Sequence, residues 1–536
     1  PDANHNLGLI AISVNQIESA LPLFKTALDV NPNIEQFWAS YVDALVRAKR
    51  LKDAKRAIKK VKKKGFDTKK IQALLLQEQG VADIKVPSKE RIDNLLEHYQ
   101  SGRLSLAEKL ALATAQEFPQ HPNSWGLLGA IFLQTGRLDE SLNAHQIAVG
   151  LDPLDAKAHS NLGVALQAIG KISDAVGSYM QALKLNPNLT IASTNLCVIL
   201  PNMKFNASYP QYYQILMDLL TKAKYLRPNM VSGSILSLLE HDPLVKSLLL
   251  EEKIALGLKK VTAMVRTLDE LSLLSRLMRT SPLPDLQFER LFVAMRRFVL
   301  TNLDQIKTSS ELINFLSTLS LHCFVNEYVY AESYEEICLV GELEKTIMQT
   351  ITKSEQPKAI NVLCLASYRP LHRYSWCQKL ESLDNFKEVK ARLIEEPLAE
   401  KVIAQNVPLM RKISDDVSLK VREQYEENPY PRWVRTGIYV KAKSISKFCD
   451  DINLRLHSEN IKNVAAPEIL IAGCGTGEHS ISTASRFSNC HVTAIDLSRA
   501  SLAYAQRKSN ELRFTNLDYM QADILHLHQM DKKFDI

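Results

Sequence analysis

EILIAGCGTGEHS, residues 468–480, changes character halfway along its length. Apart from Glu468, its first five residues are apolar and predict a short buried strand. Three alternate glycines follow, Gly473, Gly475 and Gly477, and helical spacing begins after them. Glycine allows backbone conformations closed to other residues and lets a ligand come close to the main chain. The stretch therefore predicts a strand, a ligand-binding loop and a helix, and it leaves the ligand open.

The same alternation continues to the end of the sequence. HVTAIDLS, residues 491–498, predicts a second strand ending at Asp496, and a helical pattern follows it. LDYMQADILHL, residues 517–527, predicts a third strand ending near Asp523, and KFDI at 533–536 opens a fourth. Strands that alternate with helices form a doubly wound α/β sheet, which binds ligands at the carboxyl ends of its strands.

Two phosphate-binding patterns do not fit the glycine loop. In the dinucleotide fingerprint, G-x-G-x-x-G, a count from Gly473 and Gly475 places the third glycine at Glu478. A carboxylate at the start of the helix repels a pyrophosphate bound at the helix N-terminus. A Walker loop is excluded because no Gly-Lys-Ser/Thr follows. The sequence therefore disfavours NAD and FAD.

The segments LIAGCGTG, AIDLS and QADIL instead resemble the cofactor motifs of class I S-adenosylmethionine-dependent methyltransferases. The resemblance covers about residues 465–536, with the three segments in the family's order and spacing. It implies S-adenosyl-L-methionine as the cofactor. The cofactor-binding residues that it implies are Gly473, Cys474, Gly475, Gly477, Asp496, Leu497, Asp523 and Ile524.

The resemblance also implies what these residues do. The backbone of 473–475 passes under the methionine part of the cofactor, and the carboxylate of Asp496 accepts both ribose hydroxyls. Leu497 lies against the adenine, Asp523 bonds the adenine amino group, and Ile524 adds a backbone contact. A glycine turn with no ligand would leave the acidic residues at both later strand ends unexplained.

A period of 34 residues marks the other end of the chain. Residues such as Gly8, Ala20 and Phe24 recur at fixed offsets in later copies. The pattern resembles the tetratricopeptide repeat, a helix–turn–helix unit whose copies stack into a superhelix with a concave surface. Five units are recognisable between 1 and 189, with half of another at 190–200. The resemblance implies a protein partner or substrate on the concave surface.

The period is lost beyond residue 200, although helical spacing persists to about residue 415. VREQYEENPYPRWV, residues 421–434, then ends a helix at two prolines. One interpretation is a plain helix stop followed by an ordered linker. The other is a wall of the cofactor pocket, with four side chains at its entrance: Tyr425, Tyr430, Arg432 and Trp433.

Together the patterns predict a mainly α chain with three domains. A tetratricopeptide-repeat array covers 1–200, a helical middle domain covers 201–415, and 416–536 forms the first half of a doubly wound, Rossmann-like methyltransferase domain. The sequence starts at the first position of a repeat without Met and stops as the fourth strand opens, so we expect a protein truncated at both ends.

The family's fold has seven strands, and its motif IV follows the fourth. We therefore expect the catalytic residues beyond Ile536, an unpaired apolar edge on the half sheet, and poor cofactor binding by residues 1–536 alone. Micromolar affinity in calorimetry would contradict the last expectation.

The charge and the cysteine content limit the classes of ligand and partner that the sequence predicts. The 536 residues carry a net charge of +7, and residues 47–70 alone hold 13 Lys or Arg against two Asp. A single aromatic residue, Phe66, lies among these lysines. One aromatic is too few for a surface on which bases stack, which favours a solvated helix face over a nucleic-acid partner. Eight cysteines without metal-ligand spacing predict reduced thiols and no metal site. No apolar run reaches the ~20 residues of a membrane span, so we expect a cytoplasmic protein without a membrane partner.

Two functions fit these features. The first is an S-adenosylmethionine-dependent methyltransferase whose repeats recruit a protein substrate or partner. The second is a repeat-based interaction scaffold whose α/β module is not catalytic. The sequence identifies neither the methyl acceptor nor the oligomeric state.

Overall fold

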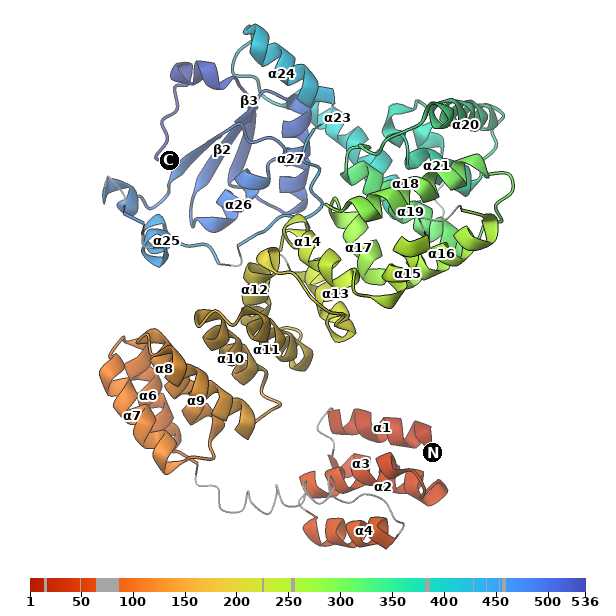
Figure 1. Ribbon diagram of the computed structural model, residues 1–536. Helices are drawn as coiled ribbons and strands as arrows, with labels where there is room; N and C mark the ends of the chain where they lie inside the picture. Colours follow the sequence, from red (N-terminus) through yellow and green to blue (C-terminus); the bar gives the residue numbers. More distant parts are fainter. Residues whose placement is uncertain are drawn as a thin grey trace. The chain divides into compact units, whose positions relative to one another are not determined.

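The computed structural model describes residues 1–13, 17–48, 50–63, 86–223, 226–251, 256–380, 386–427, 429–439, 441–452, 454–455 and 459–536. The chain divides into two compact units, Pro1–Gly170 and Lys171–Ile536. It is mainly helical, with one small parallel sheet near the C-terminus (Figure 1). The predicted fold class is therefore confirmed.

The first unit consists of short helices in consecutive pairs. Within it, α1 packs on α2, α3 on α4, α6 on α7 and α8 on α9. The helices are α1 (Asp2–Ser13), α2 (Ile17–Val30), α3 (Glu35–Arg47), α4 (Leu51–Lys63), α6 (Lys89–Gln100), α7 (Leu104–Glu117), α8 (Pro122–Gln134), α9 (Leu138–Leu151) and α10 (Ala156–Ala168). In the second unit, α11 (Ile172–Leu185) and α12 (Thr190–Ile199) continue the pattern.

The repeated glycines mark close contacts between paired helices. A Cβ on Gly8 would lie 2.6 Å from the ring of Phe24, and one on Gly129 would lie 2.8 Å from the ring of His145. Each ring belongs to the second helix of the pair, so the same contact recurs in two units. Burial lowers the pKa of His145 to about 4, which leaves a neutral ring that packs as an aromatic side chain would.

The basic segment lies partly on α4. The lysines and arginines of this helix whose exposure is described face solvent, while Ala54, Ala57, Ile58 and Val61 are buried. This arrangement agrees with a solvated helix face. Residues 49 and 64–70 of the segment lie outside the described residues.

A helical region without a repeat follows α12. Its helices are α13 (Tyr213–Lys222), α14 (Pro228–Leu239), α15 (Pro243–Glu251), α16 (Leu258–Glu270), α17 (Ser272–Thr280), α18 (Leu286–Thr301), α19 (Ser310–Val325), α20 (Tyr334–Thr352), α21 (Ala359–Ala366), α22 (Lys387–Lys390), α23 (Glu396–Asn406), α24 (Asp416–Glu427) and α25 (Ile445–Asp451). Among the described residues, none of the chain's helices combines the length and the apolar character needed to cross a membrane.

The sheet contains three parallel strands in the order β1 (Glu468–Ala472), β2 (His491–Asp496) and β3 (Leu517–Gln521). The crossover helices are α26 (Glu478–Arg486) and α27 (Arg499–Glu511). One face of the sheet is a buried apolar surface, on which Ile471, Ala494 and Tyr519 lie in register and join the core formed with both helices. This core holds the carboxyl ends of all three strands at one edge.

The second strand ends at Asp496, as the sequence predicted, and the Asp496 carboxylate accepts the Ser498 amide in a tight turn. The third strand ends at Gln521, two residues before the predicted end near Asp523. Asp523 instead caps the 3-10 helix η9 (Ile524–Gln529). Residues 533–536 are not a strand in this structure.

Both outer edges of the sheet carry hydrogen bonds, contrary to the expected unpaired edge. On the outer side of β3, the Met410 amide donates to Gln521 O over 3.0 Å, and the Gln521 amide donates to Pro408 O over 2.8 Å. On the outer side of β1, the Leu470 amide donates to Ile536 O over 2.9 Å. The segment that precedes α24 therefore covers the outer edge of β3. The last residues of the chain cover the outer edge of β1.

Candidate cofactor site

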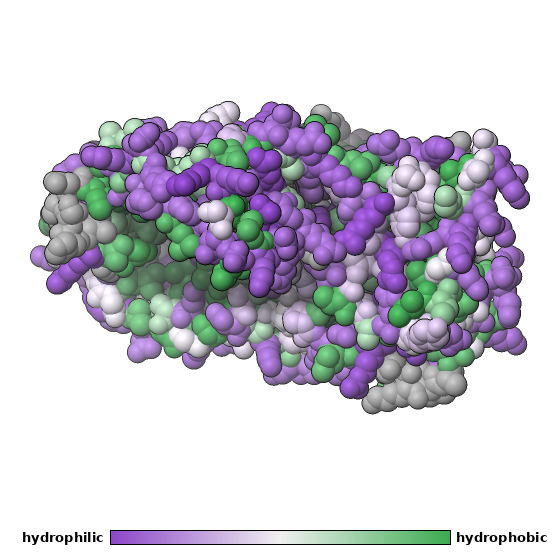
Figure 2. Space-filling view, turned by 90° about the horizontal axis from the view of Figure 1, so that it is seen from above, coloured by the Kyte–Doolittle hydropathy of each residue, from purple (hydrophilic) through white to green (hydrophobic). Residues whose placement is uncertain are grey.

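A cavity of ≈ 630 Å³ lies where the three strands end. Six of the eight predicted residues line it: Gly473, Cys474, Gly475, Asp496, Leu497 and Ile524. Gly477 and Asp523 are not among the lining residues. Figure 2 shows hydrophobic side chains gathered in a hollow on the left of the view.

All three loop glycines adopt the left-handed backbone conformation, with φ of 71° at Gly473, 53° at Gly475 and 82° at Gly477. Their surroundings differ. A Cβ on Gly473 would meet no atom within 4 Å, whereas one on Gly477 would lie 2.5 Å from the Cβ of Ala505 and 2.9 Å from the Tyr519 hydroxyl. The first glycine therefore keeps the cavity open, and Gly477 lets α26 start tightly against α27 and β3.

Gly477→Ala is expected to unfold the sheet region far more readily than Gly473→Ala. Both variants place a side chain at positive φ, which costs about 1 kcal/mol. Only the variant at 477 also forces its Cβ into Ala505, which adds about 1–3 kcal/mol of overpacking. Thermal unfolding of the two proteins measures the difference, and equal melting temperatures would contradict the assigned roles.

Asp496 ties the end of β2 to the glycine loop. Its Oδ2 accepts the Gly475 amide over 2.8 Å, and its Oδ1 accepts the Ser498 amide over 3.0 Å. A carboxylate oxygen has two lone pairs, so each oxygen can accept one more hydrogen bond. The side chain is thus fixed in orientation while it retains two acceptor sites.

Asp523 lies behind the cavity wall and is 3% exposed. Its Oδ1 accepts the Leu525 amide over 3.0 Å. Its Oδ2 is buried without a hydrogen-bond partner among the described residues, and His526 Nδ1 lies 4.0 Å away. A buried acceptor without a partner is costly, so this oxygen suits a ligand donor that reaches the wall between Ala522 and Ile524.

Cys474 lines the cavity but is not suited to act as a nucleophile. Burial, followed by the charge of Asp496, raises the pKa of its thiol well above the ordinary value. The thiolate is the reactive form of cysteine, so this side chain stays protonated at neutral pH. The part of the chain that the structure describes contains no cluster of metal-ligating side chains.

The proline-containing segment forms one wall of the cavity. Tyr425, Tyr430 and Pro431 line the cavity, as the second interpretation of this segment predicted for the tyrosines. Trp433 lies behind them, where its Nε1 donates to Thr476 O over 3.0 Å. Thr476 in turn donates from its hydroxyl to Pro431 O over 2.8 Å. The wall and the glycine loop are therefore joined by reciprocal hydrogen bonds.

The helix before this wall holds the loop that follows β2. The carboxylate of Glu426, on α24, accepts the amides of Arg499 at 2.7 Å and Ala500 at 3.0 Å. These amides are at the start of α27, where a carboxylate is favourable to the helix dipole. Ser498 also donates from its hydroxyl to Tyr425 O over 3.0 Å. One continuous segment therefore fixes both loops that border the cavity.

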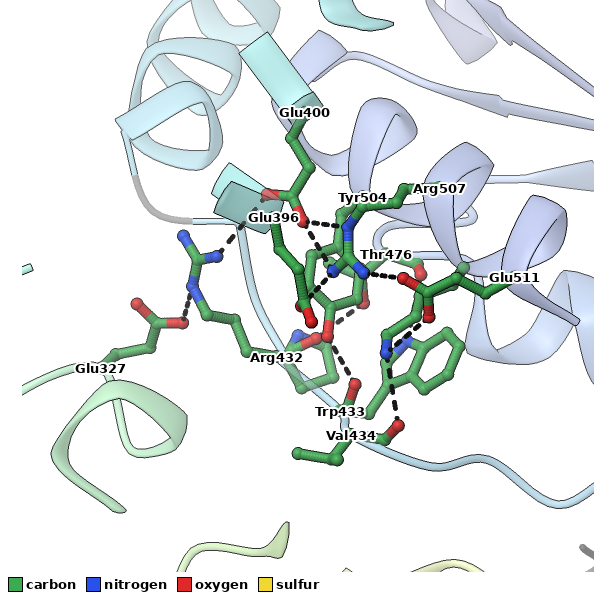
Figure 3. A network of polar contacts seen from close by, with 12 residues as sticks. Glu327, Glu396, Glu400, Arg432, Trp433, Val434, Thr476, Tyr504, Arg507 and Glu511 are labelled. Atoms are coloured by element: carbon green, nitrogen blue, oxygen red, sulfur yellow. Dashed lines mark hydrogen bonds and ion pairs between the residues drawn. The ribbon is translucent and has the colours of Figure 1, made fainter. Parts of the chain in front are cut away.

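Arg432 does not line the cavity and lies in a buried ionic network (Figure 3). Its Nε lies 2.8 Å from Glu327 Oε1, and its Nη1 lies 3.8 Å from Glu400 Oε2. The side chains of Arg432 and Glu400 are both 9% exposed. The prediction that Arg432 lines the pocket entrance is wrong, because two carboxylates from the helical region hold its guanidinium behind the wall.

Glu400 joins this network to the sheet region. Its Oε1 lies 2.8 Å from both Nε and Nη2 of Arg507 on α27, and Glu396 Oε2 lies 3.0 Å from the same Nη2. Arg507 also forms an ion pair with Glu511. Burial opposes the charge of Arg507, but the three carboxylates raise its pKa above the ordinary value. Burial raises the pKa of Glu400, against the effect of the two arginines.

Some lining residues had no signal in the sequence. Arg227 comes from the start of α14, more than 200 residues before the glycine loop, and Val421 lies one turn before Tyr425 on α24. Glu478 lines the cavity too, and its Oε1 lies 3.3 Å from Arg227 Nε. Only the packing of the helical region on the sheet region brings these side chains together.

Comparison with known families identifies both ends of the chain. A model of the methyltransferase domain matches residues 469–536. Tetratricopeptide-repeat models match residues 11–77, 93–156 and 156–189. The chain therefore carries tetratricopeptide repeats and a C-terminal methyltransferase domain, as the sequence predicted.

Two plant enzymes are similar to part of the chain. (S)-tetrahydroprotoberberine N-methyltransferase of Eschscholzia californica is 31% identical over 80 residues, which cover 15% of this chain and 23% of the enzyme. The probable (S)-tetrahydroprotoberberine N-methyltransferase 2 of Papaver bracteatum is 27% identical over 101 residues, 19% of this chain and 28% of that protein. The chain thus spans about a quarter of the length of these curated relatives.

Solved repeat structures are also similar. The first tetratricopeptide domain of Spaghetti (RPAP3), bound to an HSP90 peptide, matches with 22% identity and a TM-score of 0.21 over 22% of this chain and 95% of that one. The tetratricopeptide protein YrrB matches with 18% identity and a TM-score of 0.18 over 36% of this chain and 89% of that one. TM-scores this low carry no information about function.

Proposed function

We propose that this tetratricopeptide-repeat chain with its C-terminal methyltransferase domain is an S-adenosylmethionine-dependent methyltransferase whose repeats recruit a protein substrate or partner. The observation that carries the proposal is the cavity at the carboxyl ends of β1, β2 and β3. In a doubly wound sheet this is where a ligand binds. Its volume of ≈ 630 Å³ falls within the usual range of small-molecule sites, about 300–1,000 Å³.

The residues around the cavity fit the chemistry of this cofactor. The lone pairs left on the Asp496 carboxylate suit two ribose hydroxyls, and the open side of Gly473 allows a ligand to approach the main chain. Leu497 and Ile524 offer apolar surface to a purine. The unpartnered Oδ2 of Asp523 suits an exocyclic amino group. The cofactor supplies a methyl group on a positively charged sulfur, and the chain supplies orientation and exclusion of water.

The repeats support the second half of the proposal. Tetratricopeptide units stack so that each contacts its neighbours, which creates an extended surface suited to a protein segment. A chain that joins such units to a methyltransferase domain is suited to bring a protein to the cofactor. The names of the two plant N-methyltransferases describe the methyl acceptors of those enzymes. The similarity covers 15% and 19% of this chain, so it does not assign the same acceptors to this protein.

The proposal is tested with the full-length protein and S-adenosylmethionine labelled on its methyl group. We expect calorimetry to show binding of S-adenosylhomocysteine, and we expect label to enter protein when a cell extract is added. Binding without label in any extract component would favour the non-catalytic scaffold. Absence of binding would refute the assignment of the cavity as a cofactor site.

A further inference from the structure

Arg227 reaches the cofactor cavity from outside the methyltransferase domain. It precedes α14 as its N-cap residue, whereas the methyltransferase match begins at residue 469. Its side chain lines the cavity and pairs with Glu478, the first residue of α26, at 3.3 Å between Nε and Oε1. The Thr436 hydroxyl donates to the same Oε1 over 3.3 Å. A side chain of the helical region thus completes the wall beside the glycine loop.

A second arginine anchors the segment that carries Arg227. Arg435 donates from Nη1 to Leu220 O and from Nη2 to Ala223 O, the latter over 2.8 Å. These carbonyls belong to the last turn and C-cap of α13, where a cation is favourable to the helix dipole. Arg435, two residues after the wall tryptophan, therefore reaches the end of α13, and Arg227 follows four residues after Ala223.

The pair of Arg227 and Glu478 is only partly shielded from the cavity. The two side chains are 31% and 19% exposed, so a ligand can reach them. The contact between the two side chains joins Nε of Arg227 to Oε1 of Glu478. Within the described residues, neither Nη1 nor Nη2 of Arg227 donates a hydrogen bond. A guanidinium presents its terminal nitrogens as a planar fork that matches a carboxylate. One positive and one negative group therefore face the cavity side by side.

We propose that Arg227 and Glu478 bind the zwitterionic amino-acid end of the cofactor, Arg227 through the carboxylate and Glu478 through the ammonium group. This inference rests on the proposed function. A free α-amino acid group carries both charges on neighbouring atoms, as the ion pair does. The ligand carboxylate accepts from the terminal nitrogens of the guanidinium, and the ammonium group donates to an oxygen of Glu478. The helical region before residue 469 is then part of the cofactor site itself.

The inference predicts which ligands the site distinguishes. S-adenosylhomocysteine carries the amino-acid end, and 5′-methylthioadenosine shares its adenosine and sulfur but lacks that end. In Arg227→Met we expect the affinity for S-adenosylhomocysteine to fall about 10- to 100-fold, the range for a hydrogen bond to a charged group. The affinity for 5′-methylthioadenosine should stay within about twofold of the unchanged protein, because its adenosine contacts remain.

The experiment is calorimetry of both ligands on the full-length protein and on three variants. Arg227→Lys keeps the charge without the fork, so it should recover part of the loss. Arg103→Met removes another partly exposed arginine, which pairs with Glu97 and does not line the cavity, so it should change neither affinity. An unchanged affinity of Arg227→Met for S-adenosylhomocysteine would overturn the inference. Equal losses for both ligands would also overturn it, since they would indicate a structural role.

If the proposed function itself is wrong, the calorimetry gives a different result. If the unchanged protein binds neither ligand, the cavity is not a cofactor site, and this inference falls with that proposal. If the unchanged protein binds both ligands and Arg227→Met behaves like it, the cofactor site stands and only the role of the arginine is wrong.

Discussion

Replacing Asp496 with alanine in the full-length protein is expected to lower the affinity for S-adenosylhomocysteine by at least about 100-fold. Two contributions add. The ribose hydroxyls lose a charged acceptor, a loss of about 1.5–3 kcal/mol, and 1.4 kcal/mol is about tenfold in affinity. The Gly475 amide also loses the carboxylate that now fixes the loop at 2.8 Å. Calorimetry measures the loss directly.

A matched variant separates this effect from a general loss of an aspartate in the sheet. Asp518 lies on β3 with its side chain 76% exposed, contacts His491 at 3.1 Å and does not line the cavity. Asp518→Asn should bind S-adenosylhomocysteine as the unchanged protein does. Thermal unfolding of Asp496→Ala must show a folded protein for the comparison to count. A folded variant with unchanged affinity would contradict the assignment of Asp496.

Arg507→Met is expected to destabilise the sheet region by about 3–5 kcal/mol, the usual cost of removing one partner of a buried ion pair. Among the residues that the structure describes, the variant leaves Glu400, 9% exposed, with Arg432 at 3.8 Å as its remaining ion-pair partner. It also leaves Glu396 and Glu511 without the cation that they share. Thermal or urea unfolding monitored on the full-length protein measures the loss.

A double-mutant cycle tests whether the loss comes from the unpaired carboxylate. Adding Glu400→Gln to Arg507→Met removes the orphaned charge, so the double variant should be more stable than Arg507→Met alone. Losses that simply add would show that the two side chains do not interact. Arg103→Met serves again as the control, because exposed ion pairs are worth only about 0–1 kcal/mol.

The sequence predicted the elements whose signals are local. The 34-residue period gave the helix pairs, and contacts such as Gly8 with Phe24 recur because each unit repeats the same packing. The glycine loop and the acidic residues at strand ends gave six of the cavity-lining residues, since the carboxyl ends of parallel strands must meet at one edge. The roles of these six toward a cofactor remain predictions.

The misses are contacts between segments far apart in the chain. Gly477 resembles its neighbours in sequence, but only the position of Ala505 shows that it serves packing. Arg432 was expected at the cavity, and it instead pairs with the carboxylates of Glu327 and Glu400 in two other segments. Arg227 had no motif around it at all. These contacts form only when distant segments pack together, so the spacing of residues within one segment does not predict them.

The cover on the outer edge of β3 has a consequence for the modularity of the protein. The strand partner comes from 408–410, and the carboxylates that neutralise Arg507 come from α23. A fragment that starts at residue 416 would expose backbone groups along β3. It would also leave the buried guanidinium of Arg507 without the carboxylates of α23. The smallest autonomous form of the methyltransferase part therefore starts upstream of α23, and a transplant into another protein needs those residues as well.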